Sequence, residues 1–349
     1  MPRERFDSSR IDWPSALMRV GVADWILQRP HTSKKCPFHP ENGKTKFRFL
    51  KPLAVGRWVC NDCGTGDGID LLQRLYGWSF VEAAGAVNGC AITRKREASA
   101  QLSVTEMAAA KKLREQRFNT MRTWWKQAKT IDRVTPASRY LKNRVPRIAL
   151  AALGGDLRGH AGLAFFVEGL ESGSYEKQGS WPALLALFRD SAGSVKMMHR
   201  IFLDRDGHKA PFDNVKKMYV PEWVNGTAVR IGDDTQTVRR VIGVTEGIET
   251  GVAVFTSVCG RFPVWAAGSA HNVAHLEVPD DVEYVHIFAD NNQPRPEHRK
   301  GVGLEAAETL SDRLLAQGKK VTIHLPKKVG DDFADEWIEL CALREKHAA

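Results

Sequence analysis

The sequence predicts an α/β protein whose last third forms a mainly parallel sheet. Three short apolar runs in that third predict buried strands, because segments with helical periodicity separate them. The runs cover residues 241–245, 284–289 and 321–325. The carboxyl ends of parallel strands share one edge of a sheet, so we expect the side chains that follow these runs to converge there.

Acidic residues stand at each of these strand ends, namely Glu246, Asp290 and Asp332. Carboxylate oxygens suit Mg²⁺, which proteins bind with one or two carboxylates, waters and substrate phosphates. A single Asp after a strand is more simply a turn or helix-cap residue. Three in succession favour a divalent metal site of the kind that serves phosphoryl transfer.

Two pairs of potential metal ligands lie near the N-terminus, and each pair has a two-residue gap. The pairs are Cys36 with His39 and Cys60 with Cys63. Such pairs close a tetrahedral zinc site, and four protein ligands make one structural zinc ion. The residues between the pairs fit a small β-ribbon, followed by a helix over 69–76. The alternatives are a disulfide pair, or reduced thiols beside a chance histidine.

The order of motifs over residues 30–90 resembles the Cys-His-Cys-Cys zinc ribbon of bacterial and phage primases. The resemblance rests on Cys36-Pro37-Phe38-His39, Cys60-Asn61-Asp62-Cys63-Gly64, Gly68-Ile69-Asp70-Leu71-Leu72 and Trp78-Ser79-Phe80-Val81-Glu82. In that family the ribbon helps to engage the template and the initiating nucleotides. The resemblance therefore implies single-stranded DNA and ribonucleoside triphosphates as partners.

A basic segment follows the ribbon. The chain has a formal net charge of +10, and residues 91–147 contain 15 Lys or Arg against four acidic residues. This local excess suggests a polyanion such as nucleic acid, with a solvated linker as the alternative. Residues 91–135 should be helical, with an apolar packing face and a basic face. The basic face, which either follows a phosphate backbone or is solvated, contains Arg122, Lys126 and Lys129.

Short strands are expected next, at 162–167, 183–188 and 195–202. Cations in and after the last of these strands are expected beside the sheet edge that carries Glu246, Asp290 and Asp332, called the acidic edge below. A site that handles triphosphates needs such donors. They are His199, Arg200, Lys209, Lys216 and Lys217. Without the acidic edge, they would be ordinary polar residues of strands.

Three motifs in the C-terminal third belong together: residues 245–251, 288–292 and 331–335. In this order they resemble the Toprim fold, which primases, topoisomerases and some nucleases share. The resemblance implies that Glu246 binds metal or acts in acid–base catalysis, and that Asp290 and Asp332 bind one or two Mg²⁺ or Mn²⁺ ions. Asn292 stands where the family usually has a second Asp, so the site has one negative charge fewer, which should weaken a second cation.

These assignments divide the chain into four parts. They are a zinc-ribbon domain (1–92), a basic helical linker (93–135), the N-terminal part of a catalytic core (136–236) and a Toprim domain with a C-terminal helix (237–349). The apolar runs are too short for a membrane span, and the N-terminus lacks the pattern of a signal peptide. We therefore expect a cytoplasmic protein without a membrane partner.

The combination predicts a DNA primase that makes short RNA primers on single-stranded DNA, in the replication of a phage, plasmid or other mobile element. One alternative is a Toprim phosphodiesterase or nuclease. Another is a non-catalytic zinc-ribbon DNA-binding replication protein, which Asn292 would favour. The sequence contains no Walker loop, so the resemblance implies a separate replicative helicase as a partner.

Overall fold

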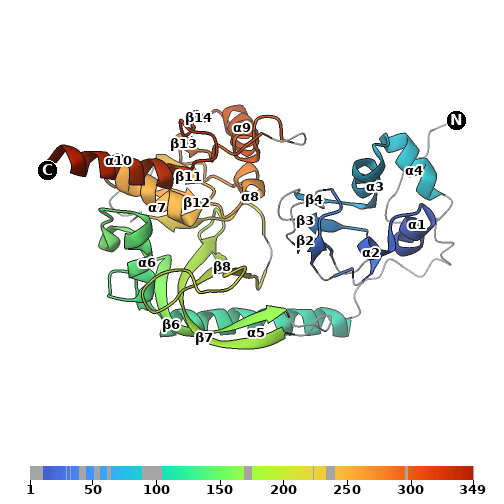
Figure 1. Ribbon diagram of the computed structural model, residues 1–349, viewed down its shortest axis with the longest axis horizontal. Helices are drawn as coiled ribbons and strands as arrows, with labels where there is room; N and C mark the ends of the chain where they lie inside the picture. The colour runs from blue at the N-terminus through green and yellow to red at the C-terminus, as the bar shows by residue number, and fades with distance from the viewer. Residues whose placement is uncertain are drawn as a thin grey trace. The chain divides into compact units, whose positions relative to one another are not determined.

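The structure is a computed structural model, and it confirms the mixed α/β class (Figure 1). It describes residues 11–28, 30–31, 33–38, 45–50, 56–60, 64–88, 104–168, 175–222, 224–232, 240–294 and 298–348. The chain divides into two compact units. The first comprises residues 1–103 and 167–176, and the second comprises residues 104–166 and 177–349.

The first unit contains a small sheet with strand order β1-β2-β3-β4, in which neighbouring strands run antiparallel. The strands are β1 (Lys34–Lys35), β2 (Thr45–Phe49), β3 (Trp58–Cys60) and β4 (Gly64–Gly66), and the helices are α1 (Trp13–Arg19), α2 (Asp24–Leu27), α3 (Gly68–Tyr76) and α4 (Phe80–Asn88). Trp13, Phe47 and Trp58 are fully buried in its core. Helix α3 begins at a capping box of Asp67 and Asp70, which supports the predicted helix at this position.

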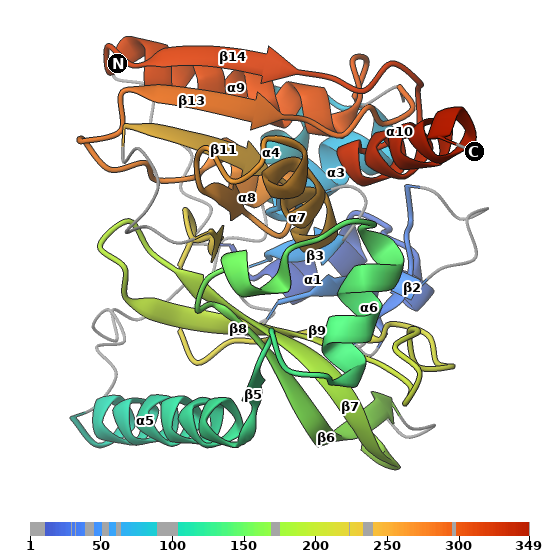
Figure 2. The same ribbon diagram turned by 90° about the vertical axis from the view of Figure 1, so that its left-hand side faces the viewer.

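The second unit begins with a long helix and a five-stranded sheet of order β5-β6-β7-β8-β9. The elements are α5 (Val104–Gln127), β5 (Lys129–Thr130), α6 (Pro136–Arg144), η4 (Leu150–Ala152), β6 (Leu157–Glu168), β7 (Tyr175–Arg189), β8 (Val195–Phe202) and β9 (Lys216–Tyr219). Strands β7, β8 and β9 pair antiparallel. Figures 1 and 2 show α5 along one face of this sheet, on the side away from the C-terminal elements.

The C-terminal elements form a second five-stranded sheet, of order β10-β12-β11-β13-β14. They are β10 (Val229–Ile231), β11 (Val241–Thr245), α7 (Ile248–Ser257), β12 (Val264–Ala266), α8 (Ala270–Ala274), β13 (Tyr284–Phe288), α9 (Val302–Ala316), β14 (Lys320–His324) and α10 (Phe333–Ala348). All neighbours in this sheet run parallel except β10, which pairs antiparallel with β12. The predicted mainly parallel sheet is thus confirmed.

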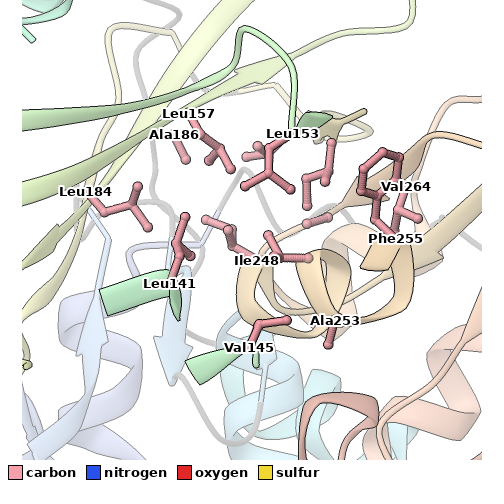
Figure 3. Packing of buried hydrophobic residues seen from close by; sticks show 14 of the residues in the cluster. Leu141, Val145, Leu153, Leu157, Leu184, Ala186, Ile248, Ala253, Phe255 and Val264 are labelled. Atoms are coloured by element: carbon pink, nitrogen blue, oxygen red, sulfur yellow. The ribbon is translucent and has the colours of Figure 1, made fainter. Parts of the chain in front are cut away.

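The two sheets of the second unit share one hydrophobic core. Leu141 of α6, Leu184 of β7 and Ile248 of α7 belong to the same buried cluster (Figure 3). A separate cluster fills the space between the parallel sheet and α8 and α9, and it includes Ile287 and Leu310. The shared core fixes the antiparallel sheet relative to the carboxyl ends of the parallel strands.

Within the ranges given above, no helix combines the length and the apolar character that a membrane span requires.

Candidate active site

The three parallel strands that precede the predicted carboxylates end level with one another. Thr245 of β11 is in register with Phe288 of β13, which in turn is in register with His324 of β14. Glu246 therefore leaves the sheet at the same edge as Asp290, two residues after β13. The charges of these two carboxylates and of Asp332 act on one another, so the predicted convergence at one edge is present.

Asp290 is the most perturbed of these carboxylates. Its Oδ1 is buried and has no hydrogen-bond partner among the described residues. Burial, together with the charges of Glu246, Asp332 and Asp335, raises the pKa of Asp290 to about 7. A buried oxygen without a donor, surrounded by further carboxylates, has the chemistry of a cation ligand. Asp290 therefore fits a divalent metal ion that one or two carboxylates and water hold.

Glu246 is half-buried, and burial raises its pKa, as does the charge of Asp332. The backbone N–H of Ala270 and the charge of Lys216 oppose this increase.

Glycine is required nearby at Gly303, because a Cβ there would collide with the carbonyl oxygen of Asp290. The first turn of α9 can approach the carboxylate loop closely for this reason.

Asp332 also has the structural role that a lone Asp suggests. Its Oδ1 accepts hydrogen bonds from the N–H groups of Ala334 (2.6 Å) and Asp335 (3.1 Å), so it caps α10. Its Oδ2 accepts a hydrogen bond from Thr250 Oγ1 of α7 at 3.1 Å. The helix cap fixes the carboxylate in place while its charge acts on Asp290 and Glu246.

Asn292 also serves a neighbouring helix. Its Oδ1 accepts a hydrogen bond from the N–H of Gly303 in the first turn of α9 at 2.8 Å. An amide oxygen can accept this bond and still has a second lone pair. The second lone pair of Asn292 Oδ1 can still coordinate a cation, but the amide lacks the negative charge that an aspartate would bring.

Within the described segments, no three His, Cys, Asp or Glu side chains lie close enough together to hold a metal ion by themselves. A Mg²⁺ ion at the edge formed by Glu246, Asp290 and Asp332 would therefore take its remaining ligands from water and substrate phosphates, as Mg²⁺ usually does. For the predicted zinc site, two ligands can be located. Cys36 and Cys60 are buried, at 4% and 1% exposure. The other two, His39 and Cys63, lie outside the described residues.

A triad of the buried Tyr140 and Glu249 with the partly exposed Lys216 lies beside the carboxylates and was not predicted from the sequence. Glu249, on α7, is 6% exposed and accepts a hydrogen bond from Tyr140 Oη of α6 at 2.6 Å. Lys216 Nζ, from β9, lies 2.8 Å from the same Oε1. Burial alone would raise the pKa of Glu249, but Lys216 and Tyr140 lower it to about 2. Glu249 is the one charged residue of α7, and a charged residue in such a buried helix indicates that a cationic partner is present. Nothing in the sequence indicates that Tyr140 also contacts it.

The structure brings three of the five predicted cations of this region to the acidic side. Lys216 acts on both Glu246 and Asp290. Lys209 and His199 are influenced by Lys216 and Glu249, so they belong to the same group. Burial, and then the charge of Lys216, lower the pKa of His199 to about 4, so its imidazole is neutral at pH 7.

The expected position is wrong for Arg200 and Lys217. These two residues face each other across β8 and β9, and side chains alternate between the faces of a sheet. The Arg200 guanidinium lies 5.1 Å from the ring of Trp124 on α5, and Lys217 Nζ lies 5.5 Å from the ring of Phe165. Both residues therefore occupy the face that is turned away from the carboxylates.

Helix α5 packs on that far face. Met121 and Ala128 are buried, so the apolar face expected in this segment packs on the sheet. Trp124 contacts Tyr219 with a ring separation of 4.8 Å. The basic face of α5 is exposed at Arg122 and Lys126. The predicted helix over residues 91–135 is too long at its C-terminal end, because α5 ends at Gln127 and Lys129 is exposed in β5. None of these three cations lies at the acidic edge.

Three family models match this chain. Residues 32–69 match a zinc-binding domain of primase-helicase, residues 115–231 a domain of unknown function (DUF7146), and residues 241–340 a Toprim domain. The first and third matches confirm the two resemblances seen in the sequence. The second covers α5 from Glu115 onward and the antiparallel sheet.

Solved structures of primases are also similar to this chain. The Aquifex aeolicus primase, with zinc-binding and RNA polymerase domains, is 17% identical with a TM-score of 0.39, and the alignment covers 90% of this chain and 77% of that one. A DnaG primase catalytic domain bound to single-stranded DNA is 14% identical with a TM-score of 0.42, over 69% and 82% of the two chains. The primase fragment of the bacteriophage T7 primase-helicase is 19% identical with a TM-score of 0.33. That alignment covers 46% of this chain and 60% of the fragment.

The level strand ends place Glu246 and Asp290 at one edge of a mainly parallel sheet. In the sequence, one family model matches before the segment of the antiparallel sheet and another matches after it. The chain thus combines a zinc-binding domain of the primase type with a C-terminal Toprim domain.

Proposed function

We propose that this protein is a DNA primase, a DNA-directed RNA polymerase that synthesises short RNA primers on single-stranded DNA. One observation carries the proposal: the unpartnered, buried carboxylate oxygen of Asp290 lies in a Toprim domain whose chain also has a primase-type zinc-binding domain. A Toprim phosphodiesterase would use the same carboxylates but has no need of that zinc-binding domain.

Glu246, Asp290 and Asp332 would hold one or two Mg²⁺ or Mn²⁺ ions, and Asn292 would add an amide oxygen. A bound ion would neutralise charge on the triphosphate and activate the attacking hydroxyl. Lys216 supplies a positive charge beside this edge, held in place by Glu249. Lys209 adds a second cation, and His199 remains neutral and can accept or donate a hydrogen bond.

The N-terminal unit would hold its zinc ion with Cys36, His39, Cys60 and Cys63. The template contacts proposed outside the acidic edge are Arg122, Lys126, Lys129, Arg200 and Lys217. Single-stranded DNA and ribonucleoside triphosphates are the proposed substrates. A separate replicative helicase is the proposed partner, in the replication of a phage, plasmid or other mobile element.

The first test is primer synthesis on single-stranded DNA with labelled ribonucleotides and Mg²⁺ or Mn²⁺, comparing the wild-type protein with Glu246→Gln. We expect a ladder of short products from the wild type and a loss of at least about 100-fold in the variant. Glu283→Gln, on an exposed glutamate before β13, is the matched control and should retain activity.

Other outcomes assign the protein to the alternatives. Degradation of the template in place of primer synthesis would identify a nuclease. Salt-sensitive DNA binding with neither reaction, even after a replicative helicase is added, would identify a non-catalytic module.

Asn292→Asp should lower the Mg²⁺ concentration needed for half-maximal primer synthesis. The carboxylate can still accept the hydrogen bond from Gly303 N–H, and it restores a negative charge beside Asp290. We expect a decrease of about threefold to tenfold, since one added charge contributes about 1 kcal/mol in a partly hydrated site. A Mg²⁺ titration that superimposes on that of the wild type would show that position 292 does not contribute to the metal site.

A further inference from the structure

We propose that the antiparallel sheet and α5 form a second binding site for single-stranded nucleic acid, separate from the Toprim carboxylates. The site is a groove of about 890 Å³ between α5 and strands β7 and β8. Its walls lie within the segment that matches a domain of unknown function, apart from Arg114 at one end. It is an extra contact for the strand, and it holds no residue of the acidic edge.

The groove lies on the far face of the sheet. Leu187 and Arg189 line it from β7. Their neighbours Ala186 and Phe188 point to the opposite face, where they belong to the core shared with the Toprim sheet. Figure 2 shows the same arrangement, with α5 and the Toprim elements on opposite sides of the sheet. A strand bound in the groove would therefore not occupy the active site.

The charge of the lining favours a polyanion. Five Lys or Arg residues line the groove against two glutamates, Glu115 and Glu222. Three of these cations are already paired: Arg114 and Lys196 with Glu222, and Arg189 with Asp156. Arg122 and Lys126 are exposed and form no ion pair within the described residues, so their positive charge is available to a ligand.

The apolar part of the lining favours unstacked bases. Phe118, Met121 and Trp125 alternate along α5 with the two available cations. Phe118 and Trp125 are only half-buried. Trp125 is held in place by Arg158, whose guanidinium lies 4.7 Å from the ring and whose Nη1 donates to the Trp125 carbonyl oxygen at 2.9 Å. A basic groove with positioned aromatic rings is the usual means of binding single strands, because every base has a face that can stack.

A double-stranded ligand fits these features less well. The bases of a duplex are stacked on one another and cannot reach Phe118 or Trp125, so a duplex would contact only the cations. Arg122 and Lys126 are four residues apart on one face of α5, about 6 Å along the helix axis. This spacing fits successive phosphates of one strand. Because only the unstacked bases of a single strand can also reach the two rings, we expect a preference for single strands.

The test is the binding of a fluorescent oligonucleotide to the full chain, without nucleotides or Mg²⁺, for the wild type and Arg122→Glu/Lys126→Glu. The matched control is Lys112→Glu/Arg117→Glu, which makes the same change of net charge on exposed residues of the same helix outside the groove. We expect the groove variant to bind single strands at least about tenfold more weakly. The salt slope, which is the steepness with which the logarithm of the binding constant falls with the logarithm of salt concentration, should decrease by about 1.4, or about 0.7 for each of the two lost phosphate contacts. The control should stay within about twofold to threefold of the wild type.

A milder variant, Trp125→Leu, tests stacking without changing the charge. It should weaken single-strand binding by about fivefold or more and leave the salt slope unchanged. Equal losses in the groove variant and its control would overturn the proposal, because only overall charge would then matter. Unchanged binding in both would overturn it too, and would leave the groove to an acidic protein segment. The assay requires no catalysis, so its result is independent of whether primer synthesis is observed.

Discussion

Asp290→Asn is expected to abolish primer synthesis and, in the same protein, to increase stability when Mg²⁺ is absent. The carboxylate has a buried oxygen without a donor and is surrounded by the charges of Glu246, Asp332 and Asp335. Removing a charge that is buried without a partner should stabilise the fold by about 1–3 kcal/mol near pH 8. The same charge is required for metal binding, so we expect activity to fall at least about 100-fold. Opposite effects on stability and activity are typical of residues kept for function.

The pH dependence of this gain follows from the pKa of Asp290. The pKa is raised from 3.8 to about 7 in the folded state, so the folded protein holds this proton more tightly than the unfolded chain. The carboxylate therefore begins to destabilise the fold as the pH rises above about 4, and the effect is complete above about 7. The advantage of Asp290→Asn over the wild type should be absent near pH 4 and largest at pH 8.

Thermal or urea unfolding in Mg²⁺-free buffer, without a chelator that would remove zinc, measures this difference. Asp281→Asn, on an exposed residue before β13, is the control and should change stability by less than about 0.5 kcal/mol. Adding Mg²⁺ should stabilise the wild type and not Asp290→Asn. A variant that is less stable than the wild type at every pH would show that Asp290 has a structural role.

The sequence was sufficient to predict the residues that follow regular patterns. Parallel strands end at one edge of a sheet, so short apolar runs predicted that Glu246 and Asp290 would converge. Paired ligands with a two-residue gap likewise predicted the zinc-binding domain. The catalytic roles and the metal ligands stay predictions, because they depend on contacts with ions and substrates. The three boundaries between the four predicted parts also stay predictions.

Residues whose role depends on tertiary packing could not be predicted in this way. Arg200 and Lys217 each directly follow a residue that faces the acidic edge, but strand alternation places both on the α5 side. The pattern of cations alone does not show which face of β8 and β9 meets the Toprim sheet. Tyr140 contacts Glu249 across 109 positions of the chain, and only the packing of α6 on α7 creates that contact.

Glu249→Ala is expected to cause the largest loss of stability among single substitutions in the Toprim domain that remove a charge. It removes the partner of Lys216 at 2.8 Å and of Tyr140 at 2.6 Å, and it leaves the buried Tyr140 hydroxyl without its acceptor. Breaking a buried ion pair costs about 3–5 kcal/mol. The Lys216 side chain is 43% exposed and can turn to water, so we expect the lower end of this range, about 3 kcal/mol.

The pair Arg240–Glu283 provides a comparison, because it also joins a basic side chain to a glutamate, at 2.7 Å, but the two side chains are 69% and 59% exposed. Glu283→Ala should cost less than about 1 kcal/mol, since water screens an exposed pair. Equal losses from Glu249→Ala and Glu283→Ala would contradict the role assigned to burial.

The pH profile separates the charge of Glu249 from its packing. Its pKa is lowered from 4.5 to about 2, so the ion pair stabilises the fold above about pH 4.5, and this stabilisation is lost as the pH falls towards 2. Glu249→Gln keeps the shape and an oxygen that can accept from Tyr140, but it has no charge to titrate. Urea unfolding from pH 7 to pH 3 should show the difference between wild type and Glu249→Gln decreasing as the pH falls. A difference that stays constant over that range would mean that packing, and not the charge held against Lys216, accounts for the contribution of Glu249.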